Sequence, residues 1–134
     1  MNCLLDTSAL LAFYFGEPGG ERVQEIVGHR RAVVRLSVLS MAEFWGRLRA
    51  EGWDQVFSSE WNQLKPLISH VEPVSEAVVR RSNELRLTAS ARLPLIDALI
   101  AATASVHEAV LVLRDPHFQS IPDDLLRQEY LLAS

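Results

Sequence analysis

The sequence predicts an α/β fold, with a central, mainly parallel sheet of four or five strands flanked by helices in three layers. Short apolar segments alternate with longer segments of helical character along the chain. Residues 109–113 form an uninterrupted apolar run, which is typical of a strand buried on both faces. No repeat or linker divides the 134 residues, so a single domain over residues 1–134 is expected.

Short apolar runs predict the strands in order. Residues 3–5 are Cys-Leu-Leu and stop at an acid, and residues 32–36 are β-branched and short. Residues 70–74 form a brief further candidate, and residues 109–113 form the clearest strand. Residues 129–132 are expected to add a last strand at one edge of the sheet.

Start and stop signals delimit the helices between these strands. A Gly-Glu-Pro-Gly-Gly turn at 16–20 ends the first helix, Ser37 or Ser40 is the expected cap of the third, and Pro66 trims the fourth. Pro94 suits the first turn of the last helix. The expected helices cover residues 7–15, 21–27, 38–51, 54–67, 75–87 and 94–107.

Composition excludes several classes of protein. Acids outnumber bases 17 to 13, which argues against a protein that coats nucleic acid through a basic surface. It is compatible with a nucleic-acid enzyme whose acids gather in a metal site. Cys3 is the only cysteine, so no internal disulfide or thiolate zinc cluster is expected. The start lacks the basic segment of a signal peptide and no uncharged run approaches ~20 residues, so we expect a cytoplasmic protein without membrane association.

Four carboxylates stand at informative positions. Asp6 directly follows the first predicted strand, and Asp115 follows the clearest strand after one residue. In open α/β sheets, ligands bind beyond the carboxyl ends of strands, where the strand order reverses. If these two strands are neighbours, both acids face one crevice. Asp97 has only apolar residues one helical turn away, and Glu43 is also flanked by apolar residues.

A carboxylate on an apolar helix face is protonated, paired or bound to a cation. Each acid also has a purely structural interpretation. Asp6 and Asp115 suit helix N-caps, Asp97 suits the positive end of a helix dipole, and Glu43 can pair with Arg47. Taken together, the four acids favour a site for Mg²⁺ or Mn²⁺, because these ions prefer oxygen ligands. Such ions activate water for phosphodiester hydrolysis.

Four sequence blocks resemble those of PIN-domain nucleases, specifically the VapC-type toxins of toxin–antitoxin pairs. The blocks are LLDTSALL at 4–11, SVLSMAE at 37–43, LPLIDALIAA at 93–102 and LVLRDPHF at 111–118. The resemblance covers nearly the whole chain. It implies a Mg²⁺- or Mn²⁺-dependent endoribonuclease that acts on structured RNA, forms a homodimer and is held inactive by a cognate antitoxin.

The resemblance also assigns roles to residues. It makes Asp6, Glu43, Asp97 and Asp115 the catalytic, metal-binding acids. Thr7 and Ser8 match the small hydroxyl residues that follow the first acid, and Ser8 is expected to steady a metal ligand or water. The chain departs from the family's pattern at residue 113, where Leu replaces the Ser or Thr often found two residues before the fourth acid.

Arginine, histidine and tryptophan side chains near these blocks have either a functional role or a structural one. Arg114, next to Asp115, is the best candidate for contact with RNA phosphate, whereas the remaining arginines are expected on solvated faces. His117 has no assigned acid partner, so a role as catalytic base is disfavoured. Tryptophans at helical positions favour a place in the core or at a dimer interface over base stacking. These tryptophans are Trp45, Trp53 and Trp61.

Three other functions compete with the nuclease. An aspartyl-phosphate phosphatase requires a second acid two residues after its nucleophile, where this chain has Ser8. A receiver domain requires a lysine after a late strand, but the only lysine is Lys65, in a helical segment. The third alternative is an inactive PIN-like module whose acidic pocket docks a protein partner, for example through an arginine.

Overall fold

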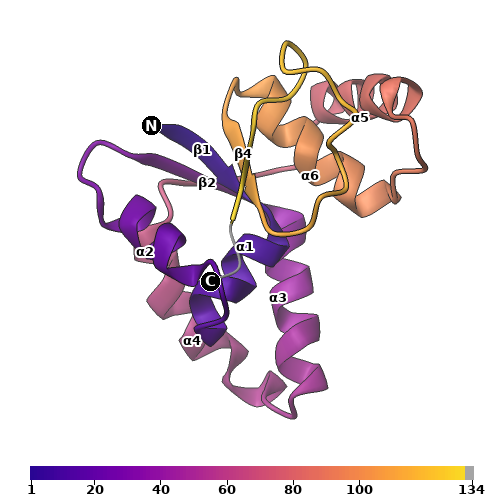
Figure 1. Ribbon diagram of the computed structural model, residues 1–134. Helices are drawn as coiled ribbons and strands as arrows, with labels where there is room; N and C mark the ends of the chain where they lie inside the picture. Colours follow the sequence, from indigo (N-terminus) through magenta and orange to yellow (C-terminus); the bar gives the residue numbers. More distant parts are fainter. Residues whose placement is uncertain (132–134) are drawn as a thin grey trace.

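One parallel sheet of five strands organises the computed structural model, which describes residues 1–131 (Figure 1). The strand order is β3-β2-β1-β4-β5, and all four neighbouring pairs are parallel. The strands are β1 (Asn2–Leu5), β2 (Val33–Ser37), β3 (His70–Glu72), β4 (Val110–Leu113) and β5 (Gln128–Tyr130). The chain therefore builds outward from β1 to one edge and then returns to the other side of β1.

The strand order reverses at β1, which lies in the middle of the sheet. Leu5, its last residue, is in register with Leu36 of β2 and Val112 of β4. The backbone N–H of Asp6 donates to the carbonyl of Val112 at 3.0 Å. The first residue after β1 is thus fixed at the carboxyl edge of the sheet, at the reversal point where α/β folds bind ligands.

Helices cover both faces of the sheet, and successive residues of each strand serve opposite layers. They are α1 (Thr7–Phe15), α2 (Gly20–Gly28), α3 (Val38–Ala50), α4 (Phe57–Leu64), α5 (Glu76–Thr88) and α6 (Leu95–Val106). Leu4 packs in the core with α5 and α6, whereas Leu5 packs in the core with α1 to α4. Figure 1 shows α5 and α6 on one side and α1, α2, α3 and α4 on the other. This three-layer arrangement confirms the predicted α/β fold.

Most element boundaries lie within one residue of the prediction, and two of the larger differences have a local reason. The segment 54–67 is α4 with a short 3₁₀ turn at each end, Asp54–Val56 and Lys65–Leu67, and Pro66 lies within the second turn. Strand β3 stops at Glu72 rather than at 74, because Pro73 has no N–H to continue the ladder. The last strand begins one residue earlier than predicted, and Leu132, its predicted end, lies outside the described residues.

Within residues 1–131, no helix combines the length and the apolar character that a bilayer span requires.

The turn between α1 and α2 depends on a glycine that allows two backbones to approach. A Cβ atom on Gly20, the first residue of α2, would lie 2.5 Å from the carbonyl oxygen of Ala12 in α1. That contact is with backbone and cannot be relieved by a side-chain rotation. Gly28, at the other end of the same helix, has no atom within 4 Å of its hypothetical Cβ.

These two glycines provide a matched test of helix packing. We expect Gly20→Ala to lower the free energy of unfolding by about 1–3 kcal/mol, because the added methyl forces α1 and α2 apart. Gly28→Ala should leave stability unchanged or raise it by less than about 1 kcal/mol. Urea denaturation of both variants measures the difference. Equal stability of the two variants would contradict the close approach of the helices.

Candidate functional site

Asp6 is both the cap of a helix and a partly buried acid. As the N-cap of α1, it accepts a hydrogen bond at Oδ1 from the backbone N–H of Ala9 at 2.9 Å. The Ser8 hydroxyl donates to the same oxygen at 2.7 Å. Burial raises the pKa of Asp6 to about 6 against the lowering effect of these two hydrogen bonds, and the nearby carboxylates of Asp115 and Asp97 raise it further.

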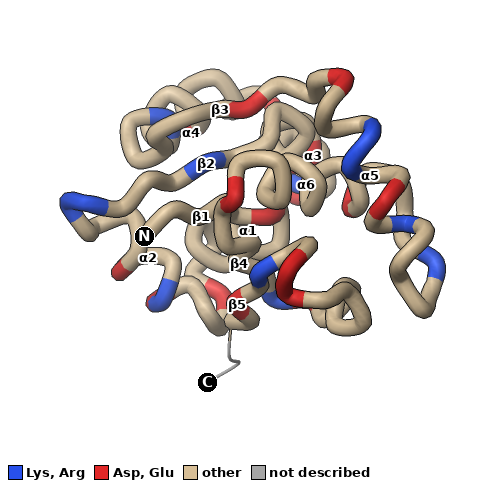
Figure 2. Tube along the Cα trace, turned by 90° about the horizontal axis from the view of Figure 1, so that it is seen from above, with Lys and Arg blue, Asp and Glu red and all other residues tan. Residues whose placement is uncertain are grey.

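A pocket of about 210 Å³ lies at the carboxyl edge of the sheet and collects the four predicted acids. They come from the end of β1, from α3, from α6 and from the segment after β4. In the view of Figure 2, acidic residues gather in the middle of the molecule around α1, α6 and the end of β4. The pocket is lined by Asp6, Thr7, Ser8, Leu11, Glu43, Asp97, Ile100, Leu111, Asp115, His117 and Phe118.

Asp97 lies in the first turn of α6, half-buried beside other titratable groups. Burial raises its pKa, and the negative charge of Asp115 adds to that rise. The side chain of His117 lowers the same pKa, which places an imidazole near this carboxylate. His117 Nε2 also lies 3.9 Å from Asp115 Oδ2. Three groups from α6 and the segment after β4 therefore share one electrostatic environment.

Glu43 reaches the pocket from α3 through the residue that follows Asp6. The Thr7 hydroxyl donates to Glu43 Oε1, and it also lies 2.9 Å from the hydroxyl of Ser40. Ser37, rather than Ser40, caps α3, since its hydroxyl accepts from the N–H of Leu39 at 3.1 Å. Ser40, the other predicted cap, is instead fully buried beside Thr7, a role that the sequence did not indicate. Thr7 and Ser8 thus each hold one acid.

The predicted acids share one pocket without forming a closed metal cage. Among residues 1–131, no three His, Cys, Asp or Glu side chains are close enough together to hold an ion. Mutually repelling carboxylates instead bond to hydroxyls, as Asp6 does to Ser8 and Glu43 to Thr7. The donor set consists of carboxylate and hydroxyl oxygens, with one imidazole at its edge, and this chemistry suits a hard divalent cation.

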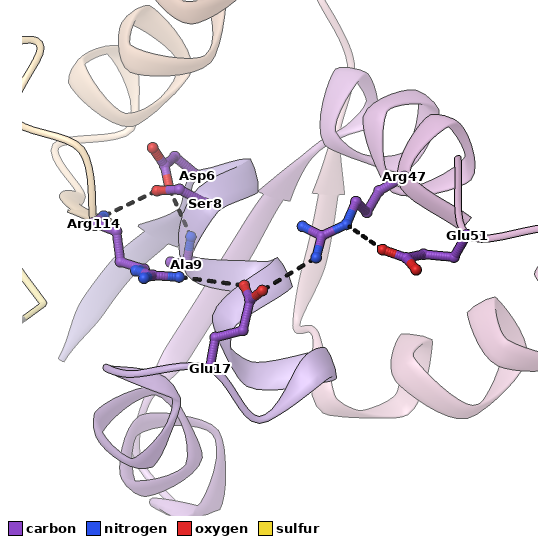
Figure 3. Close-up of polar contacts among 7 residues, drawn as sticks. All are labelled: Asp6, Ser8, Ala9, Glu17, Arg47, Glu51 and Arg114. Carbon is purple, nitrogen blue, oxygen red and sulfur yellow. Dashed lines mark hydrogen bonds and ion pairs between the residues drawn. The ribbon is translucent and has the colours of Figure 1, made fainter. Parts of the chain in front are cut away.

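Arg114 is anchored to the pocket by its backbone and to a different acid by its side chain. Its N–H donates to the Ser8 hydroxyl at 2.9 Å, and Ser8 donates in turn to Asp6 (Figure 3). Its guanidinium Nη1 donates to Glu17 Oε1 at 3.2 Å. Sequence reasoning missed Glu17, because it lies in a turn 97 positions from Arg114 with no local signal for that partner.

The other candidate arginines and tryptophans lie outside the pocket lining. Arg80 is exposed and pairs with Glu76 on its own helix, as expected for a solvated face. Trp61 is buried in the core, which confirms the structural interpretation. Trp45 and Trp53 are 41% and 50% exposed, so neither lies in the core, and a place at a dimer interface stays a prediction for them. They lie on the side of the molecule formed by α3 and the 3₁₀ turn that follows it.

Comparison with known proteins places this geometry in a family. The family model of the PIN domain matches residues 3–124. The chain belongs to the PIN domain family. This membership agrees with the parallel sheet and with the acids at its carboxyl edge. A search of curated proteins gives no match.

The chain is similar in fold to chains from solved VapBC assemblies and to a solved VapC toxin. The chain is similar to one in VapBC2 from Rickettsia felis bound to a promoter DNA fragment (TM-score 0.77, 19% identity, covering 97% of this chain and 98% of that chain). It is similar to one in VapBC-1 from nontypeable Haemophilus influenzae (TM-score 0.76, 19% identity, 98% of each chain). Mycobacterium tuberculosis VapC20, described as a sarcin–ricin loop cleaving toxin, matches with TM-score 0.67, 16% identity, 87% of this chain and 92% of that chain. At these identities the likeness shows the fold.

The raised pKa of Asp6 predicts a pH-dependent gain in stability when its charge is removed. The carboxylate form is disfavoured in the folded protein, so folding stability falls as the pH rises from about 4 to about 6. Asp6→Asn keeps a capping oxygen and should raise the free energy of unfolding by roughly 1–3 kcal/mol at pH 8. Most of this gain should vanish near pH 4.5. Urea denaturation in EDTA at the two pH values measures it.

Asp123→Asn is the matched control, because Asp123 is exposed and the substitution changes net charge equally. The control should show no comparable pH-dependent gain. If Asp6→Asn had a lower free energy of unfolding than the wild type at pH 8, the charged carboxylate would stabilise the folded protein, and the prediction would be wrong.

Proposed function

We propose that this PIN domain is a metal-dependent endoribonuclease, the toxin of a type II toxin–antitoxin pair. The observation that carries this proposal is the pocket in which Asp6, Glu43, Asp97 and Asp115 meet. These acids are separated by up to 109 positions in the chain and share no structural task. A polar pocket rich in carboxylates is costly to maintain without a cation, and a hard divalent ion offsets that cost.

The solved structures support the biological setting of the proposal. The structures from Rickettsia felis and Haemophilus influenzae are named as VapBC assemblies, and the Mycobacterium tuberculosis toxin is described as cleaving the sarcin–ricin loop. By this likeness of fold we assign the chain an antitoxin protein as partner, an RNA substrate and a homodimeric state.

Within this proposal, the acids of the pocket hold the metal ion and the neighbouring hydroxyls position the acids. Asp6, Asp97, Glu43 and Asp115 would hold Mg²⁺ or Mn²⁺, which when bound lowers the pKa of a water and stabilises charge on the phosphate. Ser8 fixes one oxygen of Asp6, leaving the other free for a cation. Thr7 orients Glu43 in the same way from the next position in the chain. The Ser8 hydroxyl also holds the backbone after β4 through Arg114, which sets the start of the segment carrying Asp115.

Metal binding is the first measurement that tests the proposal. We expect Mn²⁺ to raise the melting temperature of the wild type, because a ligand of the folded state stabilises it by about 2.7 kcal/mol at a hundredfold excess over Kd. Asp97→Asn should shift much less at the same Mn²⁺ concentration. Asp54→Asn, outside the pocket, is the control and should behave as wild type. Equal shifts in the wild type and Asp97→Asn would remove the metal site.

Cleavage of RNA is the second measurement. Sequencing of RNA ends after pulsed expression should reveal new ends with the wild type and none with Asp97→Asn. This substitution lies in α6 and leaves every residue of the sheet unchanged. With purified protein and its RNA target, we expect the substitution to lower the cleavage rate by at least about a hundredfold. An absence of new ends with a metal-binding wild type would favour the inactive, partner-binding module instead.

The partner assignment is tested by co-expression with the neighbouring small reading frame. Co-purification of its product as a stable complex supports the antitoxin assignment. A chain that purifies alone in every such pairing would count against it.

A further inference from the structure

Two arginines from distant elements converge on a single carboxylate beside the acidic pocket (Figure 3). Glu17 lies in the turn after α1. Its Oε1 accepts from Arg114 Nη1 at 3.2 Å, and its Oε2 accepts from Arg47 Nη2 at 3.1 Å. Arg47 comes from α3, and Arg114 directly precedes Asp115 of the pocket. The arrangement is an anion site in which two guanidinium groups already hold an anion, the carboxylate of the protein itself.

Both arginines are held in place by contacts other than Glu17. The guanidinium of Arg47 lies 4.4 Å from the centroid of the Phe15 ring, and its Nε donates to Glu51 at 3.4 Å. Arg114 is fixed through its backbone, since its N–H donates to Ser8, which is bonded to Asp6. The Arg47 guanidinium would therefore keep its place if Glu17 moved away, and the fixed backbone of Arg114 would keep its guanidinium within reach of the same site. A guanidinium held in place beforehand loses less conformational entropy when it binds an anion.

The bond to Glu17 is of a kind that a stronger anion can displace. The side chains of Glu17, Arg47 and Arg114 are 30%, 33% and 33% exposed, so solvent screens both ion pairs. Each arginine uses one N–H on Glu17, without the two parallel bonds of a bidentate pair. Phosphate oxygens match the planar fork of a guanidinium, and arginine is favoured wherever phosphate is recognised.

We propose that Arg47 and Arg114 form a phosphate-binding fork next to the carboxylate pocket, which Glu17 occupies until the phosphodiester backbone of RNA displaces it. This inference rests on the proposed ribonuclease function and adds to it the residues that hold the substrate outside the metal-binding acids. Glu17 acts as an internal competitor for RNA. An acidic chain thereby keeps a local site of positive charge neutral until its substrate arrives.

RNA is favoured as the occupant by the position of the fork. Arg114 and Asp115 are consecutive, so a strand whose scissile phosphate lies in the pocket passes close to the fork with a neighbouring phosphate. The acids of the pocket repel this polyanion, and the fork supplies a compensating attraction outside it. An acidic antitoxin segment is the competing occupant, and the experiment distinguishes it.

The test measures RNA binding with cleavage disabled. Binding of a fluorescent single-stranded RNA dodecamer is followed by anisotropy in the Asp97→Asn background at several salt concentrations. Adding Glu17→Gln should tighten binding roughly two- to fivefold, because the competing charge is gone. The slope of log K against log salt should change by less than about 0.7, the value of one phosphate contact on a single strand, because the fork contacts the same phosphate in both proteins.

Arginine variants and matched controls complete the design. Arg47→Gln and Arg114→Gln should each weaken binding, and the gain from Glu17→Gln should disappear in an Arg114→Gln protein. Glu84→Gln removes the same charge from an acid paired with Arg81 on α5, at 3.5 Å and away from the pocket, and should leave binding unchanged. Melting temperatures, together with the more conservative Glu17→Asp, identify any variant that fails to fold.

The outcomes separate this inference from the function on which it rests. Unchanged or weaker RNA binding by Glu17→Gln, with Mn²⁺-dependent cleavage intact in a chain with native Asp97, would overturn the fork and leave the nuclease in place. If the arginine variants bind RNA normally but lose the co-expressed antitoxin, the fork belongs to that interface and the inference is overturned. Tighter binding by Glu17→Gln without any cleavage by the native pocket would support the anion site and count against the nuclease.

Discussion

The central position of β1 is the constraint on which the rest of the site depends. Because β1 pairs with both β2 and β4, the chain that leaves it at Asp6 emerges where the two halves of the sheet diverge. The same residue caps α1, so its carboxylate accepts the N–H of Ala9 while it is partly buried. Asp6 caps a helix at the edge of the sheet where the strand order reverses. This position alone places its carboxylate in the pocket, so no further helix or loop is needed to bring it there. Asp97 and Asp115 then need only reach the same edge from the other layer and from the neighbouring strand.

The parts of this arrangement that could be predicted from sequence are those with a local cause. Asp6 stops an apolar strand, and Asp97 interrupts an apolar helix face, so each acid is visible as a costly residue in its own segment. The alternation of strands and helices then indicates which ends of the strands meet. These signals sufficed for the layered α/β fold and for the four acids that line the pocket, whereas the pairing of β1 with β4 was only a condition of that prediction.

The parts that could not be predicted depend on contacts between distant segments. Glu17 follows a helix in a turn whose Gly and Pro residues already account for its conformation, and nothing nearby indicates two arginine partners. Trp53 lies in the connection between α3 and α4, where its side chain is half exposed and stacks on Phe15 rather than packing in the core. Sequence periodicity describes a residue's own helix and carries no information on which other helix faces it.

At Leu113 the end of β4 is held without a side-chain hydroxyl. Leu113 is fully buried in the core with α5 and α6, so it contributes apolar contact and no polar group to the pocket. The strand end is fixed from the opposite side, because the Ser8 hydroxyl accepts the N–H of Arg114 and donates to Asp6. One hydroxyl on α1 therefore links the ends of β1 and β4, the two strands on which Asp6 and Asp115 depend. Since that link also sets the backbone of Arg114, the same hydrogen bonds position Asp6 and one of the two arginines of the fork.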